Sequence, residues 1–227
     1  AINDTTGAVN KNFGVAGQAS QRILVFGQTS ATAGMISAYQ PGGALDSTTF
    51  NSAGSVPGKI SGADFVGTPL ANMGPIYAYA INDQDNIYIA YQNQSTNKVD
   101  VALIYQNGSG LITEFNPNGT TPGIVDDVFG VTIANSNDVR IALNNEANLV
   151  VAAAVNGTYL LRELFSIEAF VDSTYDSDFA SSGTLTVNAG TDVSINQLTT
   201  LNDNTILITG FDNATDDSML VVRVTNA

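Results

Sequence analysis

Carboxylates are the side chains of this 227-residue sequence best suited to chemistry, because the chain has no histidine and no cysteine. The missing histidine excludes Ser–His–Asp hydrolysis and histidine-ligated metals, and the missing cysteine excludes thiolate chemistry and disulfides. Two facing carboxyl groups could still hydrolyse a glycosidic bond. Glu163 lies between Arg162 and Leu164 in a predicted strand, where it faces the core or a partner, or else forms an ordinary cross-strand charge pair.

Acidic turns offer oxygen atoms, which are the ligands that calcium prefers. Asp212, Asp216 and Asp217 fall in one predicted turn, Asp83 and Asp85 fall in another, and Asp126 and Asp127 are a further acidic pair. Neither turn has the twelve-residue spacing of an EF-hand loop. Calcium at Asp212, Asp216 and Asp217 is therefore the one cofactor that the sequence suggests. The alternative is that aspartate and asparagine serve here as turn formers.

Five of the eight tyrosines fall within about thirty residues and form a second candidate site. Aromatic rings stack on sugars and are common in protein interfaces, so these tyrosines could bind a carbohydrate or a protein. The alternative is ordinary packing across a sheet, because two of them are spaced to share one face of a strand. The residues concerned are Tyr77, Tyr79, Tyr88, Tyr91 and Tyr105.

The charge balance excludes some partners. The chain carries 21 acidic and 7 basic residues, a net charge of −14, so a nucleic acid or an anionic membrane surface would be repelled. No stretch reaches the roughly 18 apolar residues that span a bilayer, which predicts no membrane insertion. The low lysine content, together with abundant Asn, Thr, Ser and Gly, favours a secreted or cell-surface protein.

Short apolar strands recur about every sixty residues. Each is followed by a polar loop and a second apolar strand, and all but the first are preceded by a third strand that ends in an Asn- or Asp-rich turn. Such turns are typical of β-hairpins, and no segment has helical periodicity over three turns. The recurring strands begin at Ile23, Ile87, Leu149 and Ile206.

A further element follows the hairpin in three of the four copies, at residues 43–50, 110–115 and 171–179. The fourth copy lacks it, but residues 7–14 near the N-terminus have a similar pattern. We therefore predict an all-β, propeller-like domain of about four units of four short antiparallel strands, with the N-terminal segment completing the last unit. The predicted units are 22–86, 87–147, 148–204, and 205–227 plus 1–21. The closing unit looks abbreviated, since residues 13–23 leave no room for a full strand.

The motifs Gly43-Ala-Leu-Asp-Ser-Thr-Thr-Phe50, Gln21-Arg-Ile-Leu-Val-Phe-Gly27 and Asn204-Thr-Ile-Leu-Ile-Thr-Gly210 resemble the bacterial delta-sixty repeat family. The first has one residue more than the family pattern, and the turn glycine before the Ile-Leu strand is absent. The resemblance covers most of the chain and implies a propeller-like, often surface-associated bacterial protein. It implies no activity and no site residues.

Three functional hypotheses follow. A non-catalytic binding or structural module on a bacterial surface leads, because no catalytic motif is present; its partner would be a protein or a carbohydrate. The second is a carboxylate-dependent carbohydrate-active hydrolase, which needs two carboxyl groups facing each other in a pocket. The third is a self-assembling structural subunit, a homo-oligomer whose sheet edges are covered between chains.

Overall fold

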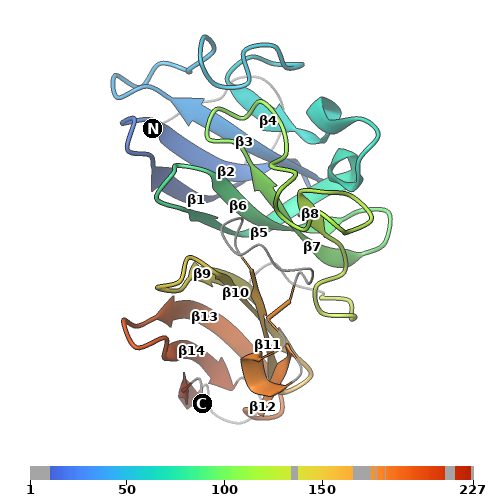
Figure 1. The fold of residues 1–227 in the computed structure, drawn as a ribbon, viewed down its shortest axis with the longest axis vertical. Helices are drawn as coiled ribbons and strands as arrows, with labels where there is room; N and C mark the ends of the chain where they lie inside the picture. The colour runs from blue at the N-terminus through green and yellow to red at the C-terminus, as the bar shows by residue number, and fades with distance from the viewer. Residues whose placement is uncertain are drawn as a thin grey trace.

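The computed structural model is all-β, with four small antiparallel sheets arranged as a four-blade β-propeller, as the sequence predicts. It describes residues 11–133, 138–165, 175–176, 178–181, 183–212 and 218–225. Blades 1 and 2 form the upper half of Figure 1, and blades 3 and 4 form the lower half. No helix among these residues has the length and apolar character needed to cross a membrane.

Each blade is a meander of neighbouring strands, and the first three blades have four strands each. Blade 1 contains β1 (Lys11–Gly17), β2 (Ile23–Ser30), β3 (Ala33–Tyr39) and β4 (Lys59–Ser61). Blade 2 contains β5 (Met73–Ile81), β6 (Ile87–Asn93), β7 (Lys98–Ile104) and β8 (Ile124–Val125). Blade 3 contains β9 (Val139–Leu143), β10 (Leu149–Val155), β11 (Thr158–Leu164) and β12 (Leu185–Asn188). Blade 4 contains β13 (Val193–Thr200), β14 (Ile206–Asp212) and β15 (Ser218–Val224).

The N-terminal segment differs from its prediction. Residues Lys11–Gly17 do not extend the last sheet; they pair with β2 and form the first strand of blade 1. Every blade therefore starts one strand earlier than the predicted units do, and a full strand does fit before Ile23. Residues 7–10, the remainder of the element expected to complete blade 4, lie outside the described residues.

One hairpin turn recurs in all four blades and joins the first strand to the second. The N–H of its first residue donates to the carbonyl of its fifth residue at 2.8–3.1 Å, and its fourth residue has a left-handed φ of 58–65°. Asp85 and Asn204 hold this position in two of the turns, whereas Gln21 and Ala147 hold it in the other two. In two turns the first residue is an asparagine, Asn82 or Asn144, whose side-chain oxygen accepts the N–H groups of the third and fifth residues. The four turns are Gln18–Arg22, Asn82–Asn86, Asn144–Asn148 and Leu201–Thr205.

The element predicted after each hairpin is a loop that buries a phenylalanine, and a short fourth strand follows it. Phe50, Phe115 and Phe179 are each at most 1% exposed. In every case the phenylalanine carbonyl accepts a hydrogen bond from a glycine N–H, at 2.6–2.8 Å. Each ring is buried in one of the apolar cores and so anchors its loop to the sheets. Two short 3-10 helices, η1 (Gly62–Phe65) and η2 (Pro69–Asn72), then lead to blade 2, and a third, η4 (Phe179–Ser181), lies in the blade 3 loop.

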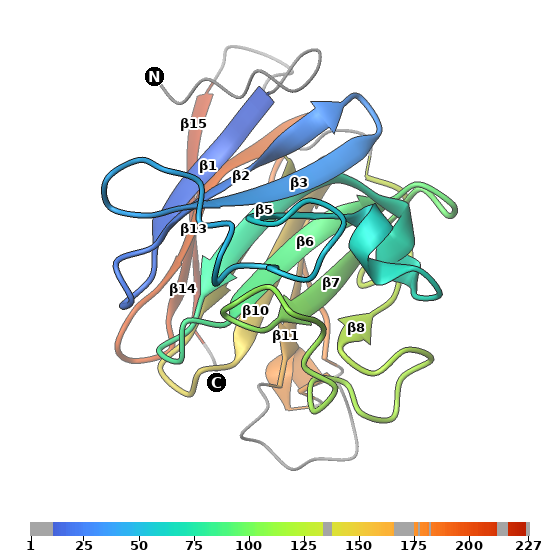
Figure 2. The same cartoon turned by 90° about the horizontal axis from the view of Figure 1, so that it is seen from above.

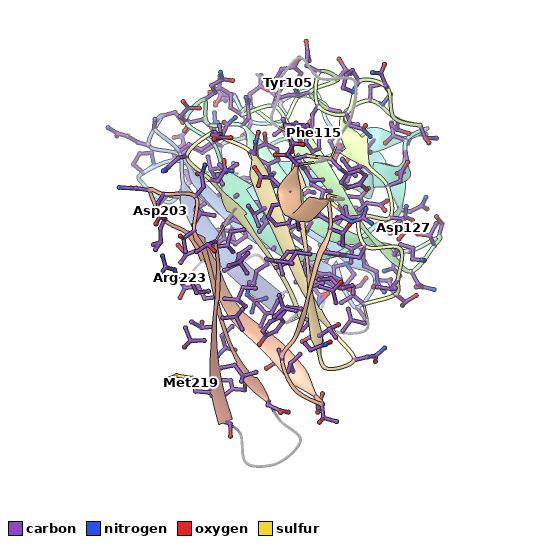
Figure 3. The ribbon with its side chains drawn as sticks, turned by 60° about the horizontal axis from the view of Figure 1, so that its bottom comes forward. Tyr105, Phe115, Asp127, Asp203, Met219 and Arg223 are labelled. Carbon is purple, nitrogen blue, oxygen red and sulfur yellow. The ribbon has the colours of Figure 1, made fainter. Side chains whose placement is uncertain are left out.

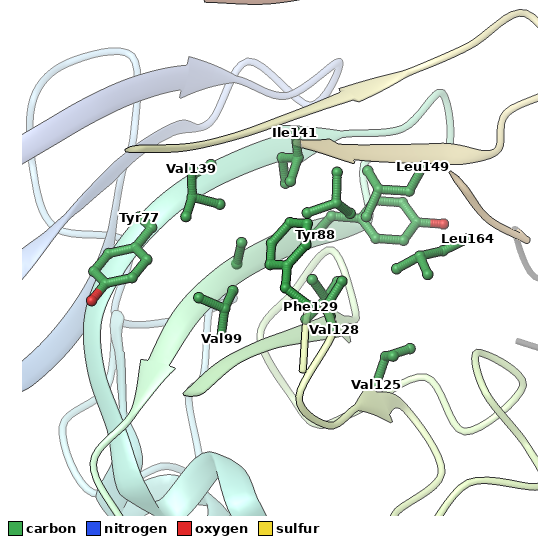
Figure 4. Packing of buried hydrophobic residues seen from close by; sticks show 14 of the residues in the cluster. Tyr77, Tyr88, Val99, Val125, Val128, Phe129, Val139, Ile141, Leu149 and Leu164 are labelled. Carbon is green, nitrogen blue, oxygen red and sulfur yellow. The ribbon is translucent and has the colours of Figure 1, made fainter. Parts of the chain in front are cut away.

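Three apolar cores lie between successive blades. Figure 2 shows the strands of blade 1 lying over those of blade 2, and Figure 4 shows the core between blades 2 and 3. Leu149, Val151 and Ala153 face blade 2, whereas Val150 and Ala152 face blade 4. Because both faces of β10 are covered, its sequence is a continuous apolar run without polar alternation.

Candidate ligand-binding cleft

The five tyrosines do not form one exposed patch. Tyr77, Tyr88 and Tyr91 are buried, and only Tyr105 is substantially exposed, at 41%. Tyr77 and Tyr88 belong to the core between blades 2 and 3, whereas Tyr79 and Tyr91 pack in the core between blades 1 and 2. Tyr77 and Tyr79 leave β5 on different faces, because the register of β5 shifts between Ile76 and Ala78.

Two of these tyrosines connect neighbouring segments of the fold. The Tyr79 ring stacks on Phe26 of blade 1 with centroids 4.0 Å apart, and its hydroxyl donates to the Val15 carbonyl at 3.1 Å. The Tyr77 hydroxyl donates to the Ile133 carbonyl, at 3.4 Å, just ahead of blade 3. The structure thus places them as packing residues, the alternative that their spacing left open.

The acidic turns also have structural partners. The Asp212 carboxylate accepts the Asp192 N–H at 3.3 Å and holds the turn before β13. Asp85 accepts the N–H groups of Ala19 and Ser20 at 2.7 and 3.2 Å, which ties blade 2 to blade 1. The described residues contain no group of three or more potential ligands arranged for a metal. Asp216 and Asp217 lie outside them, so calcium there stays a prediction.

Glu163 is buried in blade 3 and holds the first turn of that blade. Its Oε1 accepts hydrogen bonds from the side-chain amides of Asn144 at 2.7 Å and Asn148 at 3.0 Å. Burial raises the pKa of Glu163, with help from the charges of Asp176 and Glu146, and the two amides only partly offset this. The carboxyl group therefore stabilises a turn at an electrostatic cost.

We expect Glu163→Gln to stabilise the protein at neutral pH by about 1 kcal/mol. A glutamine oxygen can accept both amide bonds without a buried charge. Because the pKa of Glu163 is higher in the folded than in the unfolded state, its carboxyl group contributes fully to stability only below the unfolded-state pKa. That contribution is lost as pH rises through the folded-state pKa. Urea unfolding should therefore show a larger gain at about pH 7 than at about pH 4. An equal gain at both pH values would contradict this account, and Glu163→Ala, which loses both bonds, should destabilise.

A cleft of about 620 Å³ opens beside blade 2. One wall is the segment around η2, including Asn72, and another is the hairpin between β6 and β7, including Asn93 and Lys98. Asp100 on β7 and the pair Asp126 and Asp127, just after β8, complete it. We call this the blade 2 cleft. It gathers three carboxyl groups from two parts of one sheet, and Figure 3 shows Asp127 at the edge of the molecule.

Asp100 forms the closed floor of the blade 2 cleft. It is 1% exposed, and both of its carboxylate oxygens are occupied. The Asn93 amide and the Tyr91 hydroxyl donate to Oδ2 at 2.8 and 3.4 Å, and the Asp127 N–H donates to Oδ1 at 2.9 Å. Burial and the charge of Asp126 raise the pKa of Asp100, against the opposing effect of these donors. Asp100 thus fixes the turn that presents its two neighbours.

Asp126 and Asp127 differ in the hydrogen bonds and ion pairs that their carboxyl groups make. The Asp127 carboxylate pairs with the Lys98 ammonium at 3.2 Å and accepts the Gly130 N–H at 3.0 Å. Asp126 is half-buried, and burial raises its pKa. Within the described part of the chain, its carboxyl group makes no hydrogen bond or ion pair. Asp126 is therefore the carboxyl group most available to a ligand.

A second hollow, of about 340 Å³, lies among the loops of blades 1 and 2 around Asp64. There the Asp64 carboxylate accepts the N–H and hydroxyl of Ser55 at 2.7 and 2.9 Å and the Ser61 N–H at 2.8 Å. Burial alone would raise the pKa of Asp64, but these bonds outweigh it and hold the pKa below its usual value. Asp64 is thus committed to local structure.

Comparison with known proteins gives the fold alone. No protein-family model matches the sequence, and no curated protein matches it significantly. The chain is similar to a crystal structure of a protein of unknown function from Bacteroides caccae, with a TM-score of 0.51 and 13% identity. The similarity covers 96% of this chain and 62% of that one, so the chain spans about three-fifths of its length.

Sequence reasoning noted Asp126 and Asp127 only as a pair and missed Asp100. A signal for Asp100 was present, since it is a charged residue between Val99 and Val101 in an apolar strand. A carboxylate buried in an apolar strand needs hydrogen-bond donors around it. Such a residue therefore indicates a cluster of polar side chains at that place.

Proposed function

We propose that this domain is a non-catalytic binding module of a secreted or surface-attached bacterial protein, and that its blade 2 cleft binds a carbohydrate without negative charge. The available Asp126 carboxylate in an open cleft lined with amides and hydroxyls carries the proposal. Carboxylates accept hydrogen bonds from hydroxyl groups, and asparagine amides both donate and accept. A few such convergent groups are what orients a sugar.

The charge of the cleft supports a ligand of this class. Asp100, Asp126 and Asp127 outnumber Lys98, and Lys98 is already paired with Asp127. An anionic ligand would meet repulsion there, in addition to the net charge of −14 for the whole chain. A neutral polyhydroxylated ligand avoids that cost.

A hydrolase remains the second candidate, because burial raises the pKa of both Asp100 and Asp126. A carboxyl group with a raised pKa can protonate a leaving oxygen. Glycoside hydrolysis needs two carboxyl groups that both reach the substrate. Asp100 is closed off by its three hydrogen bonds, and Asp127 is held by Lys98, which leaves Asp126 alone at the opening. This arrangement supports binding over catalysis.

Calorimetric titration with a panel of neutral oligosaccharides tests the proposal. We expect binding to one member, and we expect Asp126→Ala to weaken it about tenfold or more, since a hydrogen bond to a charged group contributes roughly 1.5–3 kcal/mol. Asp203→Ala is the matched control, because Asp203 is 64% exposed on blade 4 and should leave affinity unchanged. Absence of binding, or equal affinity for the Asp126 variant, would refute the cleft as the site. Cleavage of a bound oligosaccharide would favour the hydrolase.

A further inference from the structure

The charged side chains that line the blade 2 cleft do not balance. Three carboxyl groups, those of Asp100, Asp126 and Asp127, stand against the one ammonium group of Lys98, which leaves a formal charge of −2. Lys98 lies 3.2 Å from Asp127 and neutralises that carboxylate. Of the other two, Asp100 is 1% exposed and Asp126 is half-buried. Asp126 is therefore the carboxylate that a ligand can reach.

The charge of Asp126 acts on the groups around it. Burial raises the pKa of Asp100 and of the Tyr91 hydroxyl, and the negative charge of Asp126 adds to both shifts. Both shifts have the sign that a neighbouring negative charge produces. A cationic group bound at Asp126 would therefore stabilise the ionised form of the whole cleft, in addition to the contact that it makes.

A metal ion does not meet this requirement, whereas an ammonium group does. Calcium takes about six to eight oxygen ligands, and the part of the chain that the structure describes has no three potential ligands arranged for a metal. Both oxygens of Asp100 are already occupied by neutral donors. An ammonium group needs one carboxylate and neutral acceptors. The Thr68 hydroxyl and the Asn72 side-chain oxygen line the same cleft and can serve as such acceptors.

We propose that the carbohydrate of the blade 2 cleft carries a free amino group, whose ammonium pairs with Asp126. The inference rests on the function proposed above and narrows its ligand class. An amino sugar suits the remaining lining, because the Thr96 hydroxyl and the Asn72 amide offer donors as well as acceptors to sugar hydroxyls. The side chain of a lysine has only the ammonium group to use them.

Calorimetric titration with β-linked oligomers of glucosamine, N-acetylglucosamine and glucose, equal in length, tests the inference. We expect the glucosamine oligomer to bind about tenfold more tightly at about pH 6, where an amine with a pKa near 8 is protonated. Added salt should reduce this preference by screening the charges. Equal affinity for the three oligomers would overturn the inference and leave the cleft as a carbohydrate site. No binding of the glucosamine oligomer would also overturn it, and the neutral panel then decides the proposed function separately.

Two substitutions that remove the same charge separate the cleft from the charge of the whole chain. Asp126→Asn should abolish the preference for the amine, since an amide forms no ion pair. Asp203→Asn should keep the preference, because Asp203 is 64% exposed on blade 4. An equal loss in both variants would mean that the net charge of −14 attracts the amine, against the inference. Binding of the tripeptide Gly-Lys-Gly as tightly as the glucosamine oligomer would instead assign the cleft to a protein partner.

Discussion

Replacing Arg22 with alanine is expected to lower the free energy of unfolding by about 3–5 kcal/mol, because it leaves a buried carboxylate without its cation. The Arg22 side chain is 12% exposed, and its Nε lies 2.8 Å from Oδ2 of Asp46, whose side chain is 6% exposed. The same guanidinium donates to the Thr49 hydroxyl at 2.9 Å and lies over the Phe50 ring. One side chain thus fixes the loop that buries Phe50.

Arg22 also joins blade 1 to blade 2. It donates to the Gln106 carbonyl at 3.0 Å and to the Gln18 side-chain oxygen at 2.8 Å. The Gln18 amide in turn donates to the carbonyls of Asp85 and Gln106 at 2.7 and 3.0 Å. Removal of the guanidinium therefore leaves several polar groups short of a partner, and such groups are costly when buried.

The pH dependence of this contribution follows from Asp46. Burial alone would raise the pKa of Asp46, but hydrogen bonds from Thr49 and Arg22 outweigh it and hold the pKa below its usual value. Because the pKa of Asp46 is lower in the folded than in the unfolded state, its carboxylate stabilises the fold above the unfolded-state pKa. This stabilisation is lost as pH falls through the folded-state pKa. The difference between wild type and Arg22→Ala should therefore shrink below about pH 4.

Urea unfolding at low protein concentration measures both effects. Arg223→Ala is the control, because Arg223 and Asp203 are 61% and 64% exposed and lie 3.9 Å apart. An exposed pair of this kind contributes at most about 1 kcal/mol. If Arg22→Ala cost no more than Arg223→Ala, the network between blades 1 and 2 would not hold the fold together.

The sequence predicted the propeller because its repeat is carried by apolar strands and by turns with a fixed hydrogen-bond pattern. The strand at which each blade begins was harder to predict. Residues 11–17 contain two glycines and little apolar alternation, and their pairing with β2 includes a register shift near Gly14. A strand of that kind is fixed by its neighbour rather than by its own side chains, so its sequence gives little signal.

The candidate site was predicted less well than the fold, for a related reason. Tyr77 and Tyr79 fit a shared face only if β5 alternates regularly, and the register shift at Ile76 breaks that alternation. The blade 2 cleft depends on Asp100 accepting a backbone N–H from Asp127, which follows a loop of about twenty residues. Contacts across such loops are set by tertiary packing and not by local pattern.

A substitution at Gly210 tests how closely the blades pack. Gly210 is buried in the middle of β14, between Ile195 and Leu220. A Cβ atom added there would overlap the Ser194 carbonyl oxygen and the Tyr159 hydroxyl. Tyr159 comes from blade 3 and donates to that same carbonyl at 3.1 Å, so the bond crosses between blades directly over the glycine.

We expect Gly210→Ala to lower the free energy of unfolding by about 3 kcal/mol, since neither obstacle can move cheaply. The carbonyl belongs to the β13 backbone, and Tyr159 is fully buried. Gly17→Ala is the matched control, because an added Cβ meets nothing within 4 Å there, and it should change stability by less than about 0.5 kcal/mol.

Tyr159→Phe separates the two obstacles at Gly210. Alone it should cost about 1 kcal/mol through the lost hydrogen bond. Combined with Gly210→Ala it should cost less than the sum of the single changes, because the hydroxyl that the new methyl group meets is gone. Strict additivity would mean that the Ser194 carbonyl alone requires glycine there. Equal stability of the Gly210 and Gly17 variants would mean that blades 3 and 4 do not pack closely over Gly210.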